Sequence, residues 1–157
     1  MRRKELEVTD RLMIEGIIKN AKFCRLGLSL ENKPYVFPLI FGYKNNTLYI
    51  HSTGGGKKVE IIKQNNNVCF ELEAKTKIIE NALSCKWDVH YQTIIGFGKA
   101  IFIENIEEKT KALDIIMKHY SNNEIQYSET YLKITTVIKI KIEEMTAKQN
   151  GYPELSN

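Results

Sequence analysis

Apolar residues recur along this chain with two periods, one typical of helices and one typical of strands. In residues 11–21 they recur every three or four positions, which predicts an amphipathic helix with Thr9 or Asp10 as its N-cap. The same period follows Asn105, where Glu108 stands at the capping-box position, and predicts a second helix. Shorter helices are expected at 57–64 and near Glu129.

Strand-like alternation is clearest near the end of the chain, where Ile138, Ile140 and Ile142 alternate with charged residues. This alternation predicts a strand with one buried face and one face exposed to solvent, as antiparallel sheets allow. The chain is expected to form six strands, at 23–30, 35–43, 47–52, 68–73, 91–103 and 138–143. Residues 74–90 have no clear period and are expected to be mostly loop, and residues 121–134 are similarly ambiguous apart from the short helix.

Two of these strands contain residues that interrupt a regular ladder. Pro38 has no N–H to donate, which favours a sheet edge or a bulge at that position. Gly96 and Gly98 indicate a bend or bulge in the long strand. Because strands follow each other mostly through short turns, we expect a mainly β, α+β fold: an antiparallel barrel with flanking helices.

The chain of 157 residues is expected to form a single domain over 1–157. Its charged start, residues 1–9, is expected to be an N-terminal arm. The end, residues 147–157, is expected to be a loosely ordered tail.

Composition describes an ordinary soluble protein, with 43% hydrophobic and 27% charged residues. The net charge of +4 is scattered, whereas nucleic-acid binders usually concentrate it on one face. Cys24, Cys69 and Cys85 form no CxxC pair and no zinc-type spacing, so no metal is expected, and Cys24 and Cys69 read as buried free thiols. With no signal-peptide pattern and no membrane-length apolar run, we expect a cytoplasmic protein.

The segment YIHSTGGGKKVEII is the most informative for chemistry. A strand ends in Ser52 and Thr53, glycines follow up to Gly56, and a helix opens with Lys57 and Lys58. Each lysine opposes the helix dipole at a cost of about 0.3–1 kcal/mol, which a bound phosphate would reverse. The segment is neither a Walker A loop nor a GxGxxG turn. It predicts a phosphate cradle, although a glycine loop with exposed lysines would have the same sequence.

The apolar strand around Pro38 is a second candidate for ligand contact. A flat aromatic cofactor needs an apolar strand whose backbone polar groups can reach its polar edge. An edge at Pro38 would leave neighbouring backbone groups free for such a ligand. The same strand could equally be plain core.

The order and spacing of five segments resemble the pyridoxamine 5'-phosphate oxidase-like, FMN-binding split barrels, and within them the 5-nitroimidazole resistance (Nim-type) proteins. The matching segments are RRKELEVTD, CRLGLSLENKPYVFPLIFGY, LYIHSTGGGKKVEIIKQNNNVCFEL, CKWDVHYQTIIGFGKAIFIENIEEK and IKIKIEEMTAK. Together they cover nearly the whole chain.

This resemblance implies a six-stranded antiparallel split β-barrel that forms a homodimer with FMN at the interface. In one subunit it implies flavin contacts along Phe37, Pro38, Leu39 and Ile40, flanking positions at His51 and Ser52, and phosphate contacts at Lys57 and Lys58. The second subunit is expected to contribute Trp87, Gln92, Thr93 and Ile94. The matching histidine of Nim-type proteins lies near flavin and substrate, so His51 is a candidate proton donor, with a structural role as the alternative.

The chain also departs from the classical oxidases of this superfamily. Those enzymes tend to carry a basic residue where this chain has Phe37, and a C-terminal tryptophan and arginine that are absent here. Vitamin B6 oxidation is therefore not expected.

The sequence leaves three alternative hypotheses about function. The first is an FMN-dependent reductase of small electron-poor molecules such as nitroaromatics, without nucleic acid or membrane as a partner. The second is a flavin- or haem-binding protein without turnover, for storage or sensing. A structural or nucleic-acid-binding role is the third and rests only on the mild positive charge.

Overall fold

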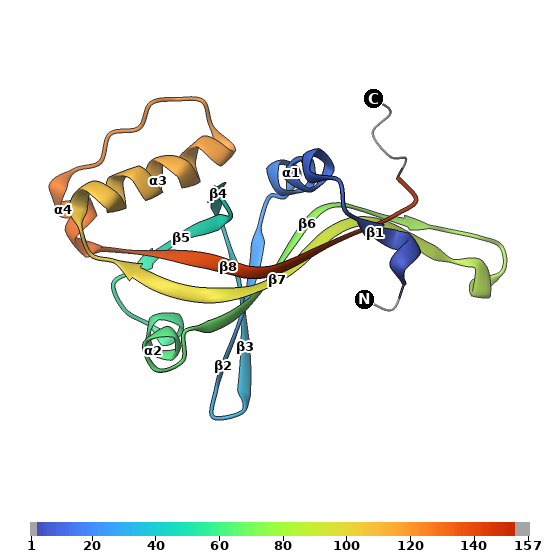
Figure 1. Cartoon of the computed structure of the whole chain (residues 1–157), viewed down its shortest axis with the longest axis horizontal. Helices are drawn as coiled ribbons and strands as arrows, with labels where there is room; N and C mark the ends of the chain where they lie inside the picture. The colour runs from blue at the N-terminus through green and yellow to red at the C-terminus, as the bar shows by residue number, and fades with distance from the viewer. Residues whose placement is uncertain (1–2, 153–157) are drawn as a thin grey trace.

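The computed structural model describes residues 3–152. Its main element is one antiparallel sheet with strand order β3-β2-β6-β7-β8-β5-β4, to which β1 is added beside β8 (Figure 1). The strands are β1 (Glu7–Val8), β2 (Cys24–Leu30), β3 (Lys33–Leu39), β4 (Gly42–Lys44), β5 (Thr47–Thr53), β6 (Asn67–Ile79), β7 (Asp88–Ile103) and β8 (Thr135–Asn150). The sheet does not close, so the mainly β split-barrel expectation is confirmed.

Three of the four described helices, α1, α3 and α4, begin at a residue whose side chain caps the helix. Asp10 accepts a hydrogen bond from Met13 N at 2.8 Å, so it is Asp10 rather than Thr9 that caps the first helix. Asn105 caps the third helix through Glu108 N at 3.0 Å. The helices are α1 (Arg11–Asn20), α2 (Lys57–Gln64), α3 (Ile106–Tyr120) and α4 (Glu129–Ile134).

The described chain has eight strands rather than the expected six. β1 and β4 span two and three residues, which is too short for a period of two to be visible in the sequence. The expected strand 35–43 is in fact interrupted after Leu39, and its last part is β4. The expectations at the interrupting residues are confirmed: Pro38 lies on the edge strand β3, and the β7–β8 register shifts between Phe97 and Gly98.

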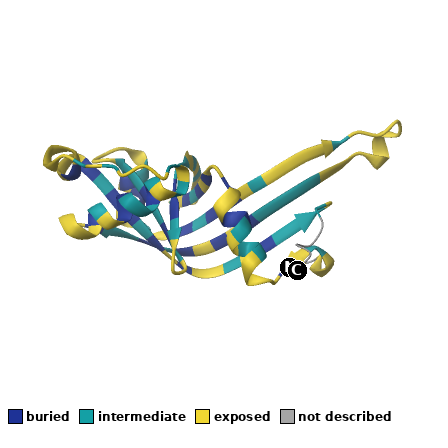
Figure 2. Cartoon of the chain, turned by 90° about the horizontal axis from the view of Figure 1, so that it is seen from above, coloured by how far each residue is buried: buried dark blue, intermediate teal, exposed yellow. Residues whose placement is uncertain are grey.

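The expectation of a loop over 74–90 is wrong, because β6 and β7 continue as a long hairpin. β6 extends to Ile79 and β7 starts at Asp88, with a register shift between Glu73 and Lys75. Figure 2 shows this hairpin projecting beyond the body of the molecule, with most of its residues exposed. Since no core covers either face there, the sequence lacks the alternation that identifies a strand.

The expected loose tail also needs correction over 147–150. These residues are the end of β8 and pair with β7, and Lys148 and Ala147 pair with Glu7 and Val8 of β1. Ala147 and Val8 are buried, so the N-terminal arm is held against the sheet at that point. Backbone pairing on both sides orders this end of β8 although its side chains are mostly polar. Residues 153–157 of the expected tail lie outside the described residues.

Two clusters of buried side chains form the core. The larger lies between the inner face of the sheet and helices α1 and α2, with Leu26, Phe70 and Ile94 at its centre. The smaller lies under α3 and includes Leu113, Ile116 and Val137. Among residues 3–152, no helix is both long and apolar enough to cross a membrane.

Candidate functional site

The junction between β5 and α2 is a helix start without a side-chain cap. Gly56 precedes the helix with a φ of 98°, a conformation that favours glycine because it has no Cβ. Within residues 3–152 no side chain caps this end; Glu60 N–H donates to the Gly56 carbonyl oxygen at 3.2 Å. The first backbone N–H groups of α2 therefore have no acceptor within the helix. Free N–H groups and the positive end of the helix dipole together favour a bound anion.

Lys57 and Lys58 both open this helix, but they differ in environment. Lys57 is exposed, with Nζ 3.8 Å from a Glu60 carboxylate oxygen and 5.8 Å from the centre of the Tyr35 ring. Lys58 is half-buried, and burial lowers the pKa of its ammonium group. No carboxylate of the described chain lies within ion-pair distance of Lys58. An anion at the helix start would supply the missing countercharge.

His51 stands two residues before the end of β5, opposite Val137 of β8. Its Nδ1 atom is buried and has no hydrogen-bond partner among the described residues. The pKa of His51 is lowered, first by burial and then by the charge of Lys58. The imidazole is therefore neutral near pH 7, with a ring nitrogen free to bond a ligand.

β3 supplies the apolar side of the candidate site. Tyr35, Phe37 and Leu39 are half-buried against the larger core cluster, while Val36 and Pro38 face outward. β3 is an edge strand of the described sheet, so one side of its backbone has no ladder partner. These residues could lie beside a flat apolar ring, as the resemblance implied.

The structure brings the two parts of the predicted site close together on one side of the molecule. The contact between Lys57 Nζ and the Tyr35 ring places the start of α2 beside the middle of β3. Ser52 and Thr53 end β5 next to the glycines and pair with Thr136 and Thr135. The cradle and the apolar strand are thus neighbours.

Trp87 and Gln92–Ile94 lie far from this cradle. On β8, the partner of His51 is Val137 and the partner of Ile94 is Ala147, ten residues further along. Ten residues of extended strand span roughly 30 Å, so the two groups cannot contact one small ligand within a single chain.

The side chains of this second group have different surroundings. Trp87 is exposed and donates from Nε1 to the Asn81 carbonyl at 2.8 Å. Gln92 Nε2 lies 3.2 Å from Gln149 Oε1, and Thr93 Oγ1 lies 3.0 Å from Glu71 Oε1. Ile94 is fully buried in the core, so only its backbone could contact a ligand.

An apolar area on the outer face of β3, β2, β6 and β7, here called the outer face, was not foreseen from the sequence. Val36 is 65%, Phe97 50% and Ile95 44% exposed, and Val36 and Ile95 line a cavity of about 440 Å³. Two rows of paired residues make up this face: Val36, Gly27, Cys69 and Phe97, then Pro38, Arg25, Glu71 and Ile95.

Arg25 is the one cationic residue in these two rows, and it forms ion pairs with two carboxylates. Its Nη1 lies 2.8 Å from Glu71 Oε2 and 3.5 Å from Glu73 Oε2. A sequence signal for this face did exist, since Ile95 and Phe97 make the long strand apolar on both faces. That pattern indicates a strand covered on both sides.

Comparison with known proteins agrees with the fold. The family model described as pyridoxamine 5'-phosphate oxidase matches residues 10–149. A candidate 5-nitroimidazole antibiotic resistance protein from Bacteroides thetaiotaomicron is 39% identical, with a TM-score of 0.82, over 91% of this chain and 86% of that one. No curated protein matches.

Two more distant solved structures have the same fold. A flavocytochrome from Azotobacter vinelandii is 16% identical with a TM-score of 0.84, and the match covers 100% of this chain and 75% of that one. The FAD and heme binding protein from Mycobacterium smegmatis is 17% identical with a TM-score of 0.83, over 96% and 76%. The resemblance inferred from the sequence is confirmed: the chain belongs to the pyridoxamine 5'-phosphate oxidase family.

Proposed function

We propose that this protein is an FMN-dependent oxidoreductase that reduces small electron-poor molecules, nitroaromatics among them, and that it works as a homodimer with FMN at the interface. The observation that carries the proposal is the β5–α2 junction. Its helix start is uncapped, Lys58 is half-buried without a carboxylate in the described chain, and His51 Nδ1 is buried without a partner.

A terminal phosphate meets each of these needs. Its oxygens accept hydrogen bonds from the free amides of α2 and its charge compensates Lys57 and Lys58. A carbon atom added at Gly55 or Gly56 would meet nothing within 4 Å, so there is open space above the helix start. Ser52 and Thr53 supply hydroxyl groups at the end of the neighbouring strand.

The isoalloxazine ring is assigned to β3. Phe37, Pro38, Leu39 and Ile40 follow its unpaired edge, with Phe37 and Leu39 on the inner face and Pro38 on the outer face, and that edge leaves backbone N–H and C=O groups available to the polar rim of a ring. The contact between Lys57 and Tyr35 supports a single ligand that reaches both parts.

A second copy of the chain is assigned to the outer face. The predicted contacts at Trp87, Gln92, Thr93 and Ile94 lie too far from the cradle to act within one chain. The exposed apolar residues Val36, Ile95 and Phe97 are of the kind that a subunit interface buries. A dimer through this face would supply the second wall of the site.

Bound FMN would supply the chemistry of the reaction, by taking electrons from a donor and giving them to an acceptor. The protein's part is to hold the phosphate, present an apolar strand and exclude water from the ring. His51, neutral in this environment, is positioned at the end of β5 to donate a hydrogen bond or to hold a proton for the reduced product. A resistance role would fit the relative from Bacteroides thetaiotaomicron.

A flavin- or haem-binding protein without turnover is the second candidate. The relatives described as a flavocytochrome and as an FAD and heme binding protein favour it, as does the free ring nitrogen of His51. Both relatives are under 20% identical, so their ligands do not transfer directly.

The first experiment is a visible absorption spectrum of the protein purified without added cofactor, with chromatography of the ligand released by heat. Flavin bands and released FMN support the proposal, whereas FAD corrects the cofactor and a haem spectrum favours the second candidate. A colourless protein that does not take up added FMN contradicts the proposal.

Turnover is tested on the flavin-loaded protein with NADH or NADPH and a nitroimidazole. Bleaching by the nucleotide, followed by reoxidation by the nitro compound with ping-pong kinetics, supports the reductase. Intersecting kinetic patterns that require a ternary complex contradict a shared site, and an absence of bleaching with both donors favours a binding protein.

A further inference from the structure

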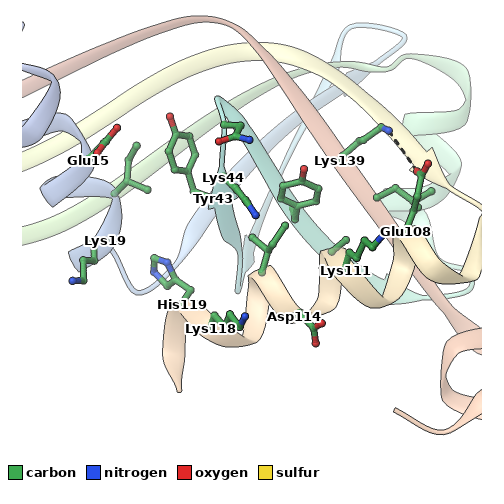
Figure 3. A pocket seen from close by; sticks show the side chains of 16 residues that line it. Glu15, Lys19, Tyr43, Lys44, Glu108, Lys111, Asp114, Lys118, His119 and Lys139 are labelled. Carbon is green, nitrogen blue, oxygen red and sulfur yellow. Dashed lines mark ion pairs between the residues drawn. The ribbon is translucent and has the colours of Figure 1, made fainter. Parts of the chain in front are cut away.

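A cavity of about 760 Å³ lies on a different part of the molecule from the proposed flavin site. It opens between α1, α3, β4 and β5, and the residues that line it converge from all four elements (Figure 3). None of the residues assigned above to the flavin is among them. The volume is enough for a small organic ligand.

The floor of this cavity is apolar, with two phenol groups. Ile18, Ile103, Ala112 and Ile115 contribute aliphatic surface. Tyr43 and Tyr49 line it as well, and within residues 3–152 neither hydroxyl has a hydrogen-bond partner. A flat ligand could lie on such a floor and bond to a phenol.

The carboxylates of the cavity already have neighbours. Glu108 pairs with Lys139 at 3.8 Å, and Glu15 pairs with Arg11 at 3.1 Å. Asp114 faces Tyr127 and helps burial to raise the pKa of that phenol to about 12. Asp114 keeps its charge, since no cation of the described chain pairs with it, but the five lysines of the lining outnumber its three carboxylates.

Three lysines of the cavity have no carboxylate within ion-pair distance in the described part of the chain. They are Lys19 of α1, Lys44 of β4 and Lys118 of α3. His119 also lines the cavity. Its Nε2 donates a hydrogen bond to the Ala21 carbonyl at 2.8 Å, and its other ring nitrogen, Nδ1, takes no part in that bond. Three lysines from three elements, none of them in an ion pair, thus surround one opening whose lining has more cations than carboxylates.

We propose that this cavity is a second ligand site, which binds a small aromatic carboxylate or sulfonate. Its flat body lies on the tyrosine and isoleucine floor, and its anionic group is held by Lys44 and Lys118. The cavity is distinct from the β5–α2 junction, so the proposal stands whether or not that junction binds flavin.

The test is isothermal titration calorimetry of the protein as purified with 2-naphthoate, beside the uncharged 2-naphthamide of the same shape. We expect one naphthoate per chain, bound about tenfold or more tightly than the amide, because hydrogen bonds to charged groups are the stronger ones. Equal affinities, or no saturable binding at millimolar concentration, overturn the proposal.

Variants locate the binding. The double substitution Lys44→Ala and Lys118→Ala changes two exposed side chains and should weaken naphthoate about tenfold or more. Lys111→Ala is the matched control, because Lys111 lines the same cavity but already pairs with Glu107 at 2.5 Å. Loss of binding in the double variant alone supports the site, and unchanged binding in it, or equal loss in Lys111→Ala, contradicts it.

Discussion

Burial lowers the pKa of His51 and the nearby charge of Lys58 lowers it further, and neither side chain has a hydrogen-bond partner or counterion among the described residues. Lys58 also opens α2, where the dipole of the helix disfavours a cation. Three unfavourable features therefore meet at one point: a half-buried ammonium group, an unpartnered imidazole nitrogen and uncapped amides. A phosphate would relieve all three, so this junction is where binding and stability can be separated by mutation.

Replacing Lys57 and Lys58 together by alanine should weaken FMN binding about tenfold or more, because in the proposed site each lysine gives a charge-assisted contact to the phosphate. The free energy of unfolding of the flavin-free protein should change by less than about 1 kcal/mol, since the lysines oppose the dipole of their helix. The measurement is a flavin titration followed by urea unfolding. Lys63→Ala, in the last turn of the same helix, is the control and should keep full flavin content.

His51 should make stability depend on pH. Its pKa in the folded protein is lower than the reference value of 6.5, so below that pH the unfolded chain binds more protons than the folded one. The free energy of unfolding of the flavin-free protein should therefore fall as the pH falls from about 6.5, and less so in His51→Gln. Urea unfolding at pH 7.5 and pH 5.0 measures this.

Bound FMN should reduce the same pH dependence, because the phosphate charge offsets that of Lys58 and favours the protonated imidazole. A pH slope that is identical in the wild type and in His51→Gln would contradict the role of His51. A slope that flavin leaves unchanged would place the phosphate elsewhere.

Much of the fold could be predicted because its signals are local. Asp10 and Asn105 cap helices as their sequence positions indicate, and the alternation of Ile138, Ile140 and Ile142 places all three inside. The hairpin over 74–90 could not be found in this way. It is held by backbone pairing between β6 and β7 while its side chains lie in solvent, so hydrophobic periodicity is absent.

The site could be predicted only in part, for a related reason. Gly56, Lys57 and Lys58 form a local motif, and the structure shows the uncapped helix start that the motif predicts. The outer face joins residues from four strands that are up to about seventy positions apart, such as Gly27 and Phe97. Only the register of the sheet brings these residues together, and no single segment of the sequence determines that register.

Introducing a charge on the outer face should separate the proposed dimer. Val36→Glu with Phe97→Glu places two carboxylates on an exposed apolar surface, so the fold should persist while association is lost. Light scattering should report a monomer, and flavin content should fall with it. Leu12→Glu is the control, because Leu12 is an even more exposed apolar residue but lies on α1, which packs against the opposite face of the sheet. A double variant that remains dimeric would exclude this face as the interface.

Tyr120 joins three segments through one hydroxyl group, which accepts a hydrogen bond from Phe41 N at 3.0 Å and donates one to the Lys22 carbonyl at 3.0 Å. Tyr120→Phe removes both bonds, and we expect it to lower the free energy of unfolding by about 1–3 kcal/mol, because the buried Phe41 loses the partner of its N–H group. Urea unfolding measures the loss. Tyr131→Phe is the control, since within the described residues that hydroxyl makes no hydrogen bond.

The same change should also reach the flavin site, because Phe41 immediately follows the residues Phe37 to Ile40 that are assigned to the ring. Without the Tyr120 hydroxyl, the end of β3 is held less firmly, and flavin affinity should fall in Tyr120→Phe at a temperature where the protein is still folded. Unchanged flavin affinity together with reduced stability would mean that Tyr120 supports the fold alone, and that β3 keeps its position without it.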